Sequence, residues 1–332
     1  MMRTPVYLFL ALALASPAAA VEARNPVEIK EWVVPYESSR PRDPFARRAD
    51  EVWFVGQRGH YLARLDPTNG EFSRRRLEDR PGPHNLIVGS DGIVWYAGNR
   101  KGYIGRYDPQ SGRIERIAMP DPRARDPHTL VFDSAERHIW FTLQASNRVG
   151  RLRLADRSVE LIAVESPHAR PYGIIVAADG VAWIALFGTN RLASVDPRTL
   201  EIAEHALPNP GARPRRLGAG GDGSIFYTDY ARGTLGRLDP ATGKVEEWAM
   251  PSGGNAQPYA MAVDAIGRVW FVETGPSPNN LVGFDPRRRE FFSVTPIPSG
   301  AGSVRHMDYH APTRTIWFGT DSNTIGRARL GE

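Results

Sequence analysis

The segment PHNLIVGSDGIVWYAGNRKGYIGRYDPQSGRIERI, from Pro83 to Ile117, decides the fold of this 332-residue chain. Its apolar stretches have the length of β-strands, and turn-forming pairs such as Asp91-Gly92 and Asp108-Pro109 separate them. An Asp-Gly pair between two apolar runs is a strong signal for a β-hairpin. The segment therefore predicts four short antiparallel strands joined by tight turns.

The same pattern returns through the whole chain. One aromatic residue in the second apolar run marks each copy, at Trp53, Trp95, Trp140, Trp183, Phe226, Trp270 and Trp317. Successive markers are 42 to 47 residues apart, a period at which four-stranded repeats form propeller blades. We predict an all-β, seven-bladed β-propeller with four antiparallel strands per blade. The alternative, an irregular β-sandwich, would not keep an aromatic residue in phase seven times.

The two ends of the repeat array indicate how the ring closes. After Trp317 the chain supplies one further strand, residues 324–330, and no fourth. The missing strand is at the other end, where EIKEWVVP (residues 28–35) resembles the fourth strand KVEEWAMP (residues 244–251). We expect this N-terminal strand to complete the last blade, which leaves no open seam. Residues 21–332 then form a single domain.

The first twenty residues, MMRTPVYLFLALALASPAAA, have the pattern of a secretory signal peptide, with cleavage predicted after Ala20. We therefore predict a secreted protein, periplasmic if the host has an outer membrane. The apolar run from Val6 to Ala15 is shorter than the roughly 20 residues that span a bilayer, so no membrane span is expected. The absence of cysteine excludes disulfides and thiol chemistry.

Composition excludes further classes of protein. With 41% apolar and 24% charged residues the chain is expected to fold around a large core, and its 32 glycines and 28 prolines indicate many turns. The net charge of +5 is modest, and no basic helix accompanies it. We expect a monomer that does not bind nucleic acid.

Polar residues gather at one mouth of the predicted central channel. In each copy the innermost strand begins at a proline or its equivalent, and the next residues are Arg42, His84, His128, Tyr172, Arg215, Tyr259 and Arg305. One interpretation is a small-molecule site in which histidine acts as base or metal ligand and arginine binds an anion or carbonyl. The other is a water-filled channel without chemistry. His84 and His128 are the best single candidates, and Glu273 is the acid that we expect to face this mouth.

Four units of the chain resemble the virginiamycin B lyase (streptogramin lyase) family. They are WFVE (residues 270–273), NTIGR (323–327), EEWAMP (246–251) and RPYGI (170–174). The resemblance covers all seven copies. It implies a seven-bladed enzyme that opens a cyclic depsipeptide lactone by elimination, with a magnesium ion and a histidine base.

The resemblance also implies roles for individual residues. The family's histidines follow proline in the last two blades, where this chain has Tyr259 and Arg305. His306 lies one position later, which on a regular strand points it to the other face unless a β-bulge intervenes. Glu273 matches a family acid, and Asp321 takes the place of the last one. The predicted site has His306, Tyr259, His84 and His128 as catalytic residues, Arg42, Tyr172, Arg215 and Arg305 as substrate-binding residues, and Glu273 and Asp321 as Mg²⁺ ligands.

Two functional hypotheses follow. The first is a metal-assisted lyase that acts on a lactone or ester at the channel mouth. The second is a non-catalytic periplasmic binding or scaffold propeller. Arg42, Arg215, Arg216 and Arg305 support the second hypothesis, because they suit an anionic ligand or an acidic protein partner.

Overall fold

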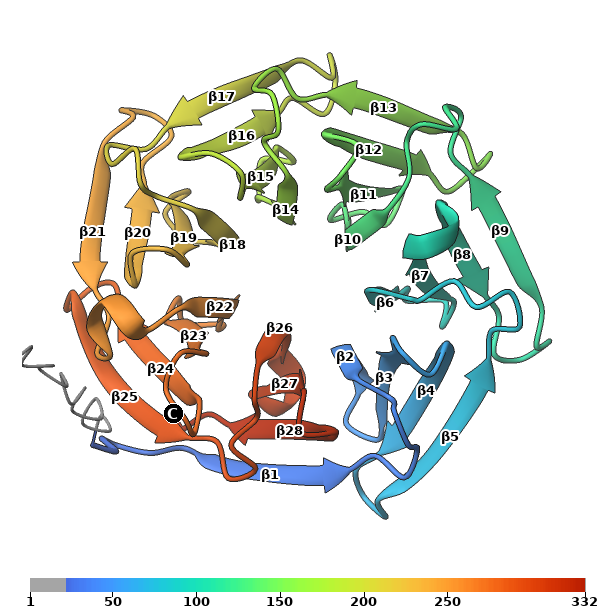
Figure 1. Ribbon diagram of the computed structural model, residues 1–332, viewed down its shortest axis with the longest axis horizontal. Helices are drawn as coiled ribbons and strands as arrows, with labels where there is room; N and C mark the ends of the chain where they lie inside the picture. The colour runs from blue at the N-terminus through green and yellow to red at the C-terminus, as the bar shows by residue number, and fades with distance from the viewer. Residues whose placement is uncertain (1–21, 332) are drawn as a thin grey trace, which may run out of the picture.

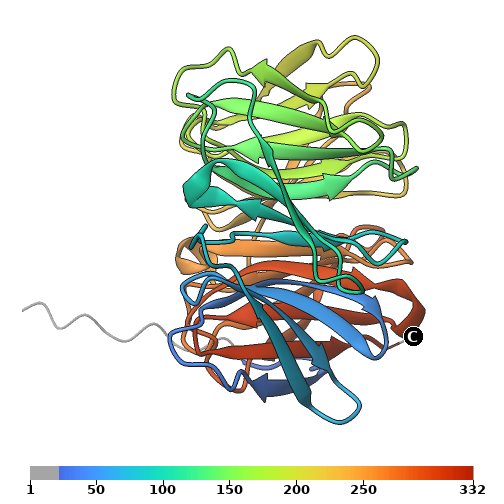
Figure 2. The same ribbon diagram turned by 90° about the vertical axis from the view of Figure 1, so that its right-hand side faces the viewer.

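Seven antiparallel sheets, each of four strands, surround a central axis in the computed structural model, which describes residues 22–331 (Figure 1). The predicted all-β, seven-bladed propeller is confirmed. Seen from the side, the molecule is a short cylinder with the strands running between its two faces (Figure 2). The predicted signal peptide lies outside the described residues. No helix among residues 22–331 is long and apolar enough to cross a membrane.

The first four blades follow the chain in order, each from the innermost strand outward. Blade 1 has β2 (Pro41–Arg48), β3 (Glu51–Gly56), β4 (Tyr61–Asp66) and β5 (Glu71–Arg76). Blade 2 has β6 (Leu86–Val88), β7 (Val94–Gly98), β8 (Tyr103–Tyr107) and β9 (Ile114–Ala118). Blade 3 has β10 (Pro127–Phe132), β11 (His138–Leu143), β12 (Arg148–Arg153) and β13 (Val159–Ala163). Blade 4 has β14 (Pro171–Val176), β15 (Ala182–Leu186), β16 (Arg191–Val195) and β17 (Ile202–Ala206).

The remaining blades complete the ring. Blade 5 has β18 (Pro214–Ala219), β19 (Ile225–Asp229), β20 (Thr234–Leu238) and β21 (Val245–Ala249). Blade 6 has β22 (Pro258–Val263), β23 (Val269–Glu273), β24 (Asn280–Asp285) and β25 (Glu290–Pro296). Blade 7 has β26 (Val304–His310), β27 (Thr315–Thr320), β28 (Thr324–Arg329) and β1 (Glu28–Val33). Within residues 22–331, three one-turn 3-10 helices lie in loops, namely η1 (Asn99–Lys101), η2 (Gly253–Asn255) and η3 (Ala311–Thr313).

The N-terminal strand closes the ring as predicted. β1 pairs antiparallel with β28, from Glu28 opposite Arg329 to Val33 opposite Thr324 (Figure 1). Trp32 of β1 stacks on the marker Trp317 of β27, with ring centroids 5.5 Å apart. Because this contact joins the first strand to the last hairpin, blade 7 depends on both ends of the chain.

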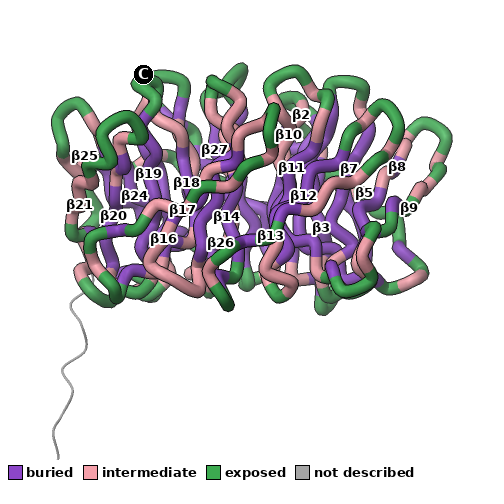
Figure 3. Tube along the Cα trace, turned by 90° about the horizontal axis from the view of Figure 1, so that it is seen from above, coloured by how far each residue is buried: buried purple, intermediate pink, exposed green. Residues whose placement is uncertain are grey.

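The hydrophobic core lies between neighbouring blades. All seven marker aromatics are on the second strand of their blade, and all are buried. Trp140 of blade 3, for example, belongs to a buried cluster with Ile174 and Ile184 of blade 4. In Figure 3 the buried residues accordingly form the middle of the cylinder, and the exposed ones lie in the loops at its two faces. The marker repeats because every blade needs one large side chain to fill the wedge to the next.

The inner strands are irregular at the end where they begin. The pairing register shifts directly after this point in six inner strands, for example between Pro127 and Leu130 of β10 and between Val304 and Met307 of β26. In blade 2, His84 and Asn85 keep backbone hydrogen bonds to Ala97 but lie before β6. A bulge re-aims side chains, so two consecutive residues of a blade can both serve the channel.

Candidate functional site

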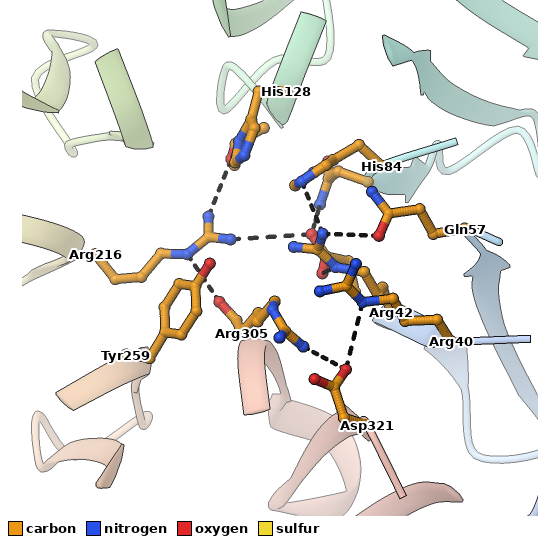
Figure 4. Close-up of polar contacts among 12 residues, drawn as sticks. Arg40, Arg42, Gln57, His84, His128, Arg216, Tyr259, Arg305 and Asp321 are labelled. Atoms are coloured by element: carbon orange, nitrogen blue, oxygen red, sulfur yellow. Dashed lines mark hydrogen bonds and ion pairs between the residues drawn. The ribbon is translucent and has the colours of Figure 1, made fainter. Parts of the chain in front are cut away.

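Seven residues at the starts of the inner strands lie around one mouth of the channel. We call Arg42, His84, His128, Tyr172, Arg215, Tyr259 and Arg305 the upper ring. Arg42 Nη1 lies 2.8 Å from His84 Nε2 and donates to the Gln57 side chain at 3.2 Å (Figure 4). The rings of His84 and His128 are 3.7 Å apart, and those of His128 and Tyr172 are 4.3 Å apart. The predicted gathering of these side chains is therefore present.

Two tyrosines and one arginine form the aromatic side of the upper ring. The hydroxyl groups of Tyr172 and Tyr259 are hydrogen-bonded to each other, although the residues come from blades 4 and 6. The guanidinium of Arg215 lies 3.5 Å from the ring centroid of Tyr259 and 4.2 Å from that of Tyr230. Phe187 encloses the same guanidinium at 4.6 Å. Such cation-π contacts fix the arginine in place, and its Nε–H is buried without a hydrogen-bond partner in the described part of the chain.

The pKa values of the two tyrosines move in opposite directions. Burial raises the pKa of Tyr172, but the positive charges of Arg215, Arg42 and Arg216 outweigh this effect and hold the pKa below its usual value of 10. Burial and the neighbouring Tyr172 raise the pKa of Tyr259 to about 12. Tyr172 is therefore the member of the pair that more readily ionises to the phenolate, the form that can act as a base.

Both histidines of the upper ring are held neutral. Burial lowers the pKa of His84 well below 6.5, and Arg42 lowers it further. Burial and Arg216 do the same for His128. A neutral imidazole at neutral pH can accept a proton, but the surrounding arginines oppose the charged form that would result.

Arg305 and Asp321 lie at the edge of the mouth. Asp321 forms an ion pair with Arg305 and a second one with Arg40, whose Nε is 3.5 Å from the carboxylate (Figure 4). Burial raises the pKa of Asp321, but the hydrogen bond and charge of Arg305 lower it more. Asp321 is therefore an ionised partner of two arginines.

Directly behind the upper ring, polar side chains close the channel. Arg216 spans it, donating from Nη1 to Thr129 Oγ1 of blade 3 and from Nε to the Arg305 carbonyl of blade 7, at 3.0 Å each. Its Nη2 lies 4.0 Å from Asp43 of blade 1, and Asp43 accepts a hydrogen bond from Asn85 at 3.0 Å. We call Asp43, Asn85, Thr129, Arg216 and His306 the plug.

The mouth carries an excess of positive charge. Arg40, Arg42, Arg215, Arg216 and Arg305 face the carboxylates of Asp43 and Asp321, and five cations against two anions leave a net charge of +3. Several buried guanidinium nitrogens have no hydrogen-bond partner in the described part of the chain, namely Nε and Nη2 of Arg42, Nε of Arg215 and Nη2 of Arg216. Unsatisfied buried donors of this kind are costly and indicate where an acceptor would bind.

The predicted magnesium ligands do not fit a magnesium ion in this arrangement. Glu273 is fully buried on β23, where its carboxylate accepts hydrogen bonds from the Ser252 backbone at 2.9 Å and hydroxyl at 2.5 Å. Asn280 donates to the same carboxylate at 3.4 Å. We expected Glu273 to face the mouth, but its carboxylate instead binds the loop that precedes blade 6. Burial raises the pKa of Glu273. Asp321 is occupied by arginines, and among residues 22–331 no three His, Asp or Glu side chains converge to hold a metal.

His306 is a member of the plug and not of the upper ring. The register shift in β26 turns it into the channel, as expected if a bulge intervenes. Burial and Arg216 lower its pKa to about 4, and its Nδ1 is buried without a hydrogen-bond partner. His306 is therefore separated from the mouth by the upper ring.

Sequence reasoning missed part of this arrangement. Asp43 and Arg40, which balance and extend the arginine cluster, were not predicted as site residues. The signal was present in the position after the upper ring, which contains Asp43, Asn85, Thr129, Arg216 and His306 in five of the seven copies. Strict strand alternation hides this position, and only the bulge brings it into the channel.

Comparison with known proteins places the chain in a family. The model of the virginiamycin B lyase family matches residues 21–195, which is more than half of the chain. The chain belongs to the virginiamycin B lyase family. No sequence among the curated proteins matches it.

Solved structures similar to this member of the virginiamycin B lyase family include both enzymes and binding proteins. A streptogramin B lyase has 22% identity and a TM-score of 0.82, with 93% of this chain and 100% of that chain covered. Virginiamycin B lyase from Staphylococcus aureus also has 22% identity and a TM-score of 0.82, covering 92% and 99%. YCF48 bound to the D1 peptide has 12% identity and a TM-score of 0.73, covering 96% and 100%. At these identities the likeness shows the fold alone.

Proposed function

We propose that the channel mouth of this propeller binds a small organic anion that carries carboxylate groups. The observation that carries the proposal is the arginine cluster with its net charge of +3 and its buried guanidinium nitrogens that have no hydrogen-bond partner in the described residues. Of these, Nη2 of Arg42 and Nε of Arg215 also lie outside the ion pairs with Asp43. Arginine binds carboxylates through paired N–H donors. The aromatic rings around Arg215 would contact the carbon skeleton of the ligand.

Calorimetry with succinate and citrate tests this proposal. Arg215→Met and Arg305→Met are expected to weaken binding at least tenfold, because each removes a donor and a charge from the mouth. Arg287→Met is the matched control, since Arg287 is exposed on the hairpin between β24 and β25. Failure of both anions to bind wild type, or equal affinity in all three variants, would refute the proposal.

A second candidate function is a carbon–oxygen lyase that acts on a lactone or ester. It is favoured by family membership and by the hydrogen-bonded Tyr172–Tyr259 pair. The Tyr172 phenolate would take the proton from the carbon next to the C–O bond. The C–H electron pair would form the double bond, and the C–O pair would leave with the carboxylate oxygen, whose charge Arg215 and Arg42 would neutralise.

Mass spectrometry of the product tests the lyase function. Elimination opens a cyclic lactone without a change of mass, whereas hydrolysis adds the mass of one water. Tyr172→Phe should abolish turnover and leave citrate binding within about threefold of wild type. Metal analysis of the purified protein and of Glu273→Ala is the second measurement: a stoichiometric magnesium ion lost in the variant would replace this tyrosine route by the metal-assisted one predicted from the resemblance.

We propose further that the protein is exported as a monomer. Export rests on the signal-like residues 1–20, and a protein isolated from cells should begin at Val21 when its N-terminus is sequenced. Size-exclusion chromatography with light scattering tests the monomer. Recovery of a stable complex with an acidic protein would instead favour a scaffold function.

A further inference from the structure

A second cavity lies in the channel on the other side of the plug. It has a volume of about 360 Å³, and its lining reaches the last residues of β14, β18 and β22, Val176, Ala219 and Val263. It therefore extends away from the upper ring, toward the opposite face of the propeller. We call it the lower channel. Its volume lies at the small end of ligand pockets, which measure about 300–1,000 Å³.

The walls of the lower channel are apolar apart from Asp308 and Tyr309 of β26, and Arg216 and His306 of the plug lie at its upper end. Phe45, Ile87, Val131, Ile175 and Ala262 contribute carbon surface from five different blades. Blade 7 contributes Asp308 at the corresponding place on β26. A single carboxyl group thus faces a wall of hydrocarbon side chains.

Asp308 has little to compensate its charge. Its Oδ2 accepts one hydrogen bond, from the Ala46 backbone N–H at 3.1 Å. It forms no ion pair with any residue of the described range 22–331. Burial accordingly raises its pKa to about 6, so at neutral pH the group is an ionised carboxylate without a cation.

Two further polar side chains of this cavity, Arg216 and His306, belong to the plug. Arg216 is engaged with Thr129, the Arg305 carbonyl and Asp43. His306, two residues before Asp308, is neutral at pH 7 because its pKa is lowered to about 4, and its Nδ1 is buried without a partner. A neutral imidazole offers a lone pair to a hydrogen-bond donor.

We propose that the lower channel binds a small apolar amine, whose ammonium group pairs with Asp308 while its hydrocarbon body packs against the aliphatic walls. The ammonium has three N–H donors, enough for the free carboxylate oxygen and for His306. An anion is disfavoured by Asp308, and a purely apolar ligand would leave the carboxylate without a partner. This site does not depend on the anion site proposed for the mouth.

Calorimetry at pH 7.5 with benzylamine and its neutral counterpart benzyl alcohol tests the site. Benzylamine is expected to bind wild type at least tenfold more tightly than benzyl alcohol. Asp308→Asn keeps the shape and the acceptor for Ala46 but removes the charge, and it should weaken benzylamine at least tenfold. Asp321→Asn, which removes a carboxylate at the other mouth, is the matched control and should leave benzylamine unchanged.

The pH dependence of wild type provides a test without substitution. Benzylamine affinity should fall as the pH is lowered from 7.5 to 5, because Asp308 becomes protonated near pH 6. Arg216, His306 and Tyr309 are the other titratable groups that line the cavity, and His306 remains neutral over this range. Equal affinity for the two probes, a constant affinity between pH 7.5 and 5, or weakening in Asp321→Asn but not in Asp308→Asn would overturn the proposal.

Discussion

The two ends of the central channel are built from the same seven strands and present opposite chemistry. The upper mouth combines arginines with tyrosine and histidine rings, and its charge is strongly positive. The lower channel is mainly apolar and contains Asp308 as its single acid among the described lining residues. The plug around Arg216 stands between them.

The difference shows where a repeat protein can vary. Most lower-channel positions lie after the register shift, in regularly paired parts of the inner strands, where apolar side chains such as Val131 and Val176 also pack against the core between blades. The upper ring and plug lie at the irregular start of each strand, where packing constrains the side chain less. Function is therefore expected at the bulged ends, and a polar residue among the aliphatic positions, such as Asp308, is the exception that indicates a second site.

Breaking the plug should have the largest effect. Arg216→Met removes one of the positive charges beside the buried Asp43. Removal of one member of a buried charge pair lowers the free energy of unfolding by about 3–5 kcal/mol. Urea denaturation should show this loss in the free energy of unfolding. Arg216→Met combined with Asp43→Asn should recover part of it. A loss below about 1 kcal/mol for the single variant would show that the plug does not hold the blades together.

The histidines of the mouth should make the protein sensitive to acid. The pKa values of His84 and His128 are lower in the folded state than in the unfolded state. The free energy of unfolding is therefore fully retained above about pH 6.5 and decreases as the pH falls below that value. Below about pH 6.5, each histidine that stays neutral in the folded protein lowers the free energy of unfolding by about 1.4 kcal/mol per pH unit. His84→Asn should reduce the slope of unfolding free energy against pH between 6.5 and 5. An unchanged slope would mean that His84 is protonated in the folded protein.

The lower channel should respond to pH in the opposite sense. The raised pKa of Asp308 means that the folded state binds a proton more tightly than the unfolded state between about pH 4 and 6, so stability falls as the pH rises through this window. Asp308→Asn should therefore stabilise the protein by about 3 kcal/mol at pH 7.5 and not at pH 4. Thermal unfolding of both proteins at the two pH values measures the difference. Equal shifts at both values would contradict an uncompensated carboxylate.

The smallest expected effect concerns the edge of the mouth. Asp321→Asn releases Arg305 and Arg40 from their ion pairs and should strengthen citrate binding about threefold at low salt. Raising the salt concentration should reduce the gain, because the charges are partly exposed. Weaker binding in the variant would show that Asp321 positions Arg305 for the ligand.

The sequence predicted the fold better than the site. Seven markers in phase and the match between residues 28–35 and 244–251 were sufficient for the ring and its closure. The mouth residues followed from their place after each proline. The environment of Glu273 did not follow, because the loop that carries Ser252 folds over it. Contacts across the ring, such as Tyr172 with Tyr259, join residues 87 positions apart and depend on the exact curvature of the sheet array.

Closure through β1 has a consequence for the order of folding during synthesis. β1 is made early and its partner β28 comes about 290 residues later, which at 5–20 residues per second is roughly 15–60 s of translation. For that time Trp32 has no Trp317 to stack on, and the array has two unpaired ends. A chain in this state is a row of blades and not yet a ring, so both ends of the channel acquire their binding chemistry in a single late event.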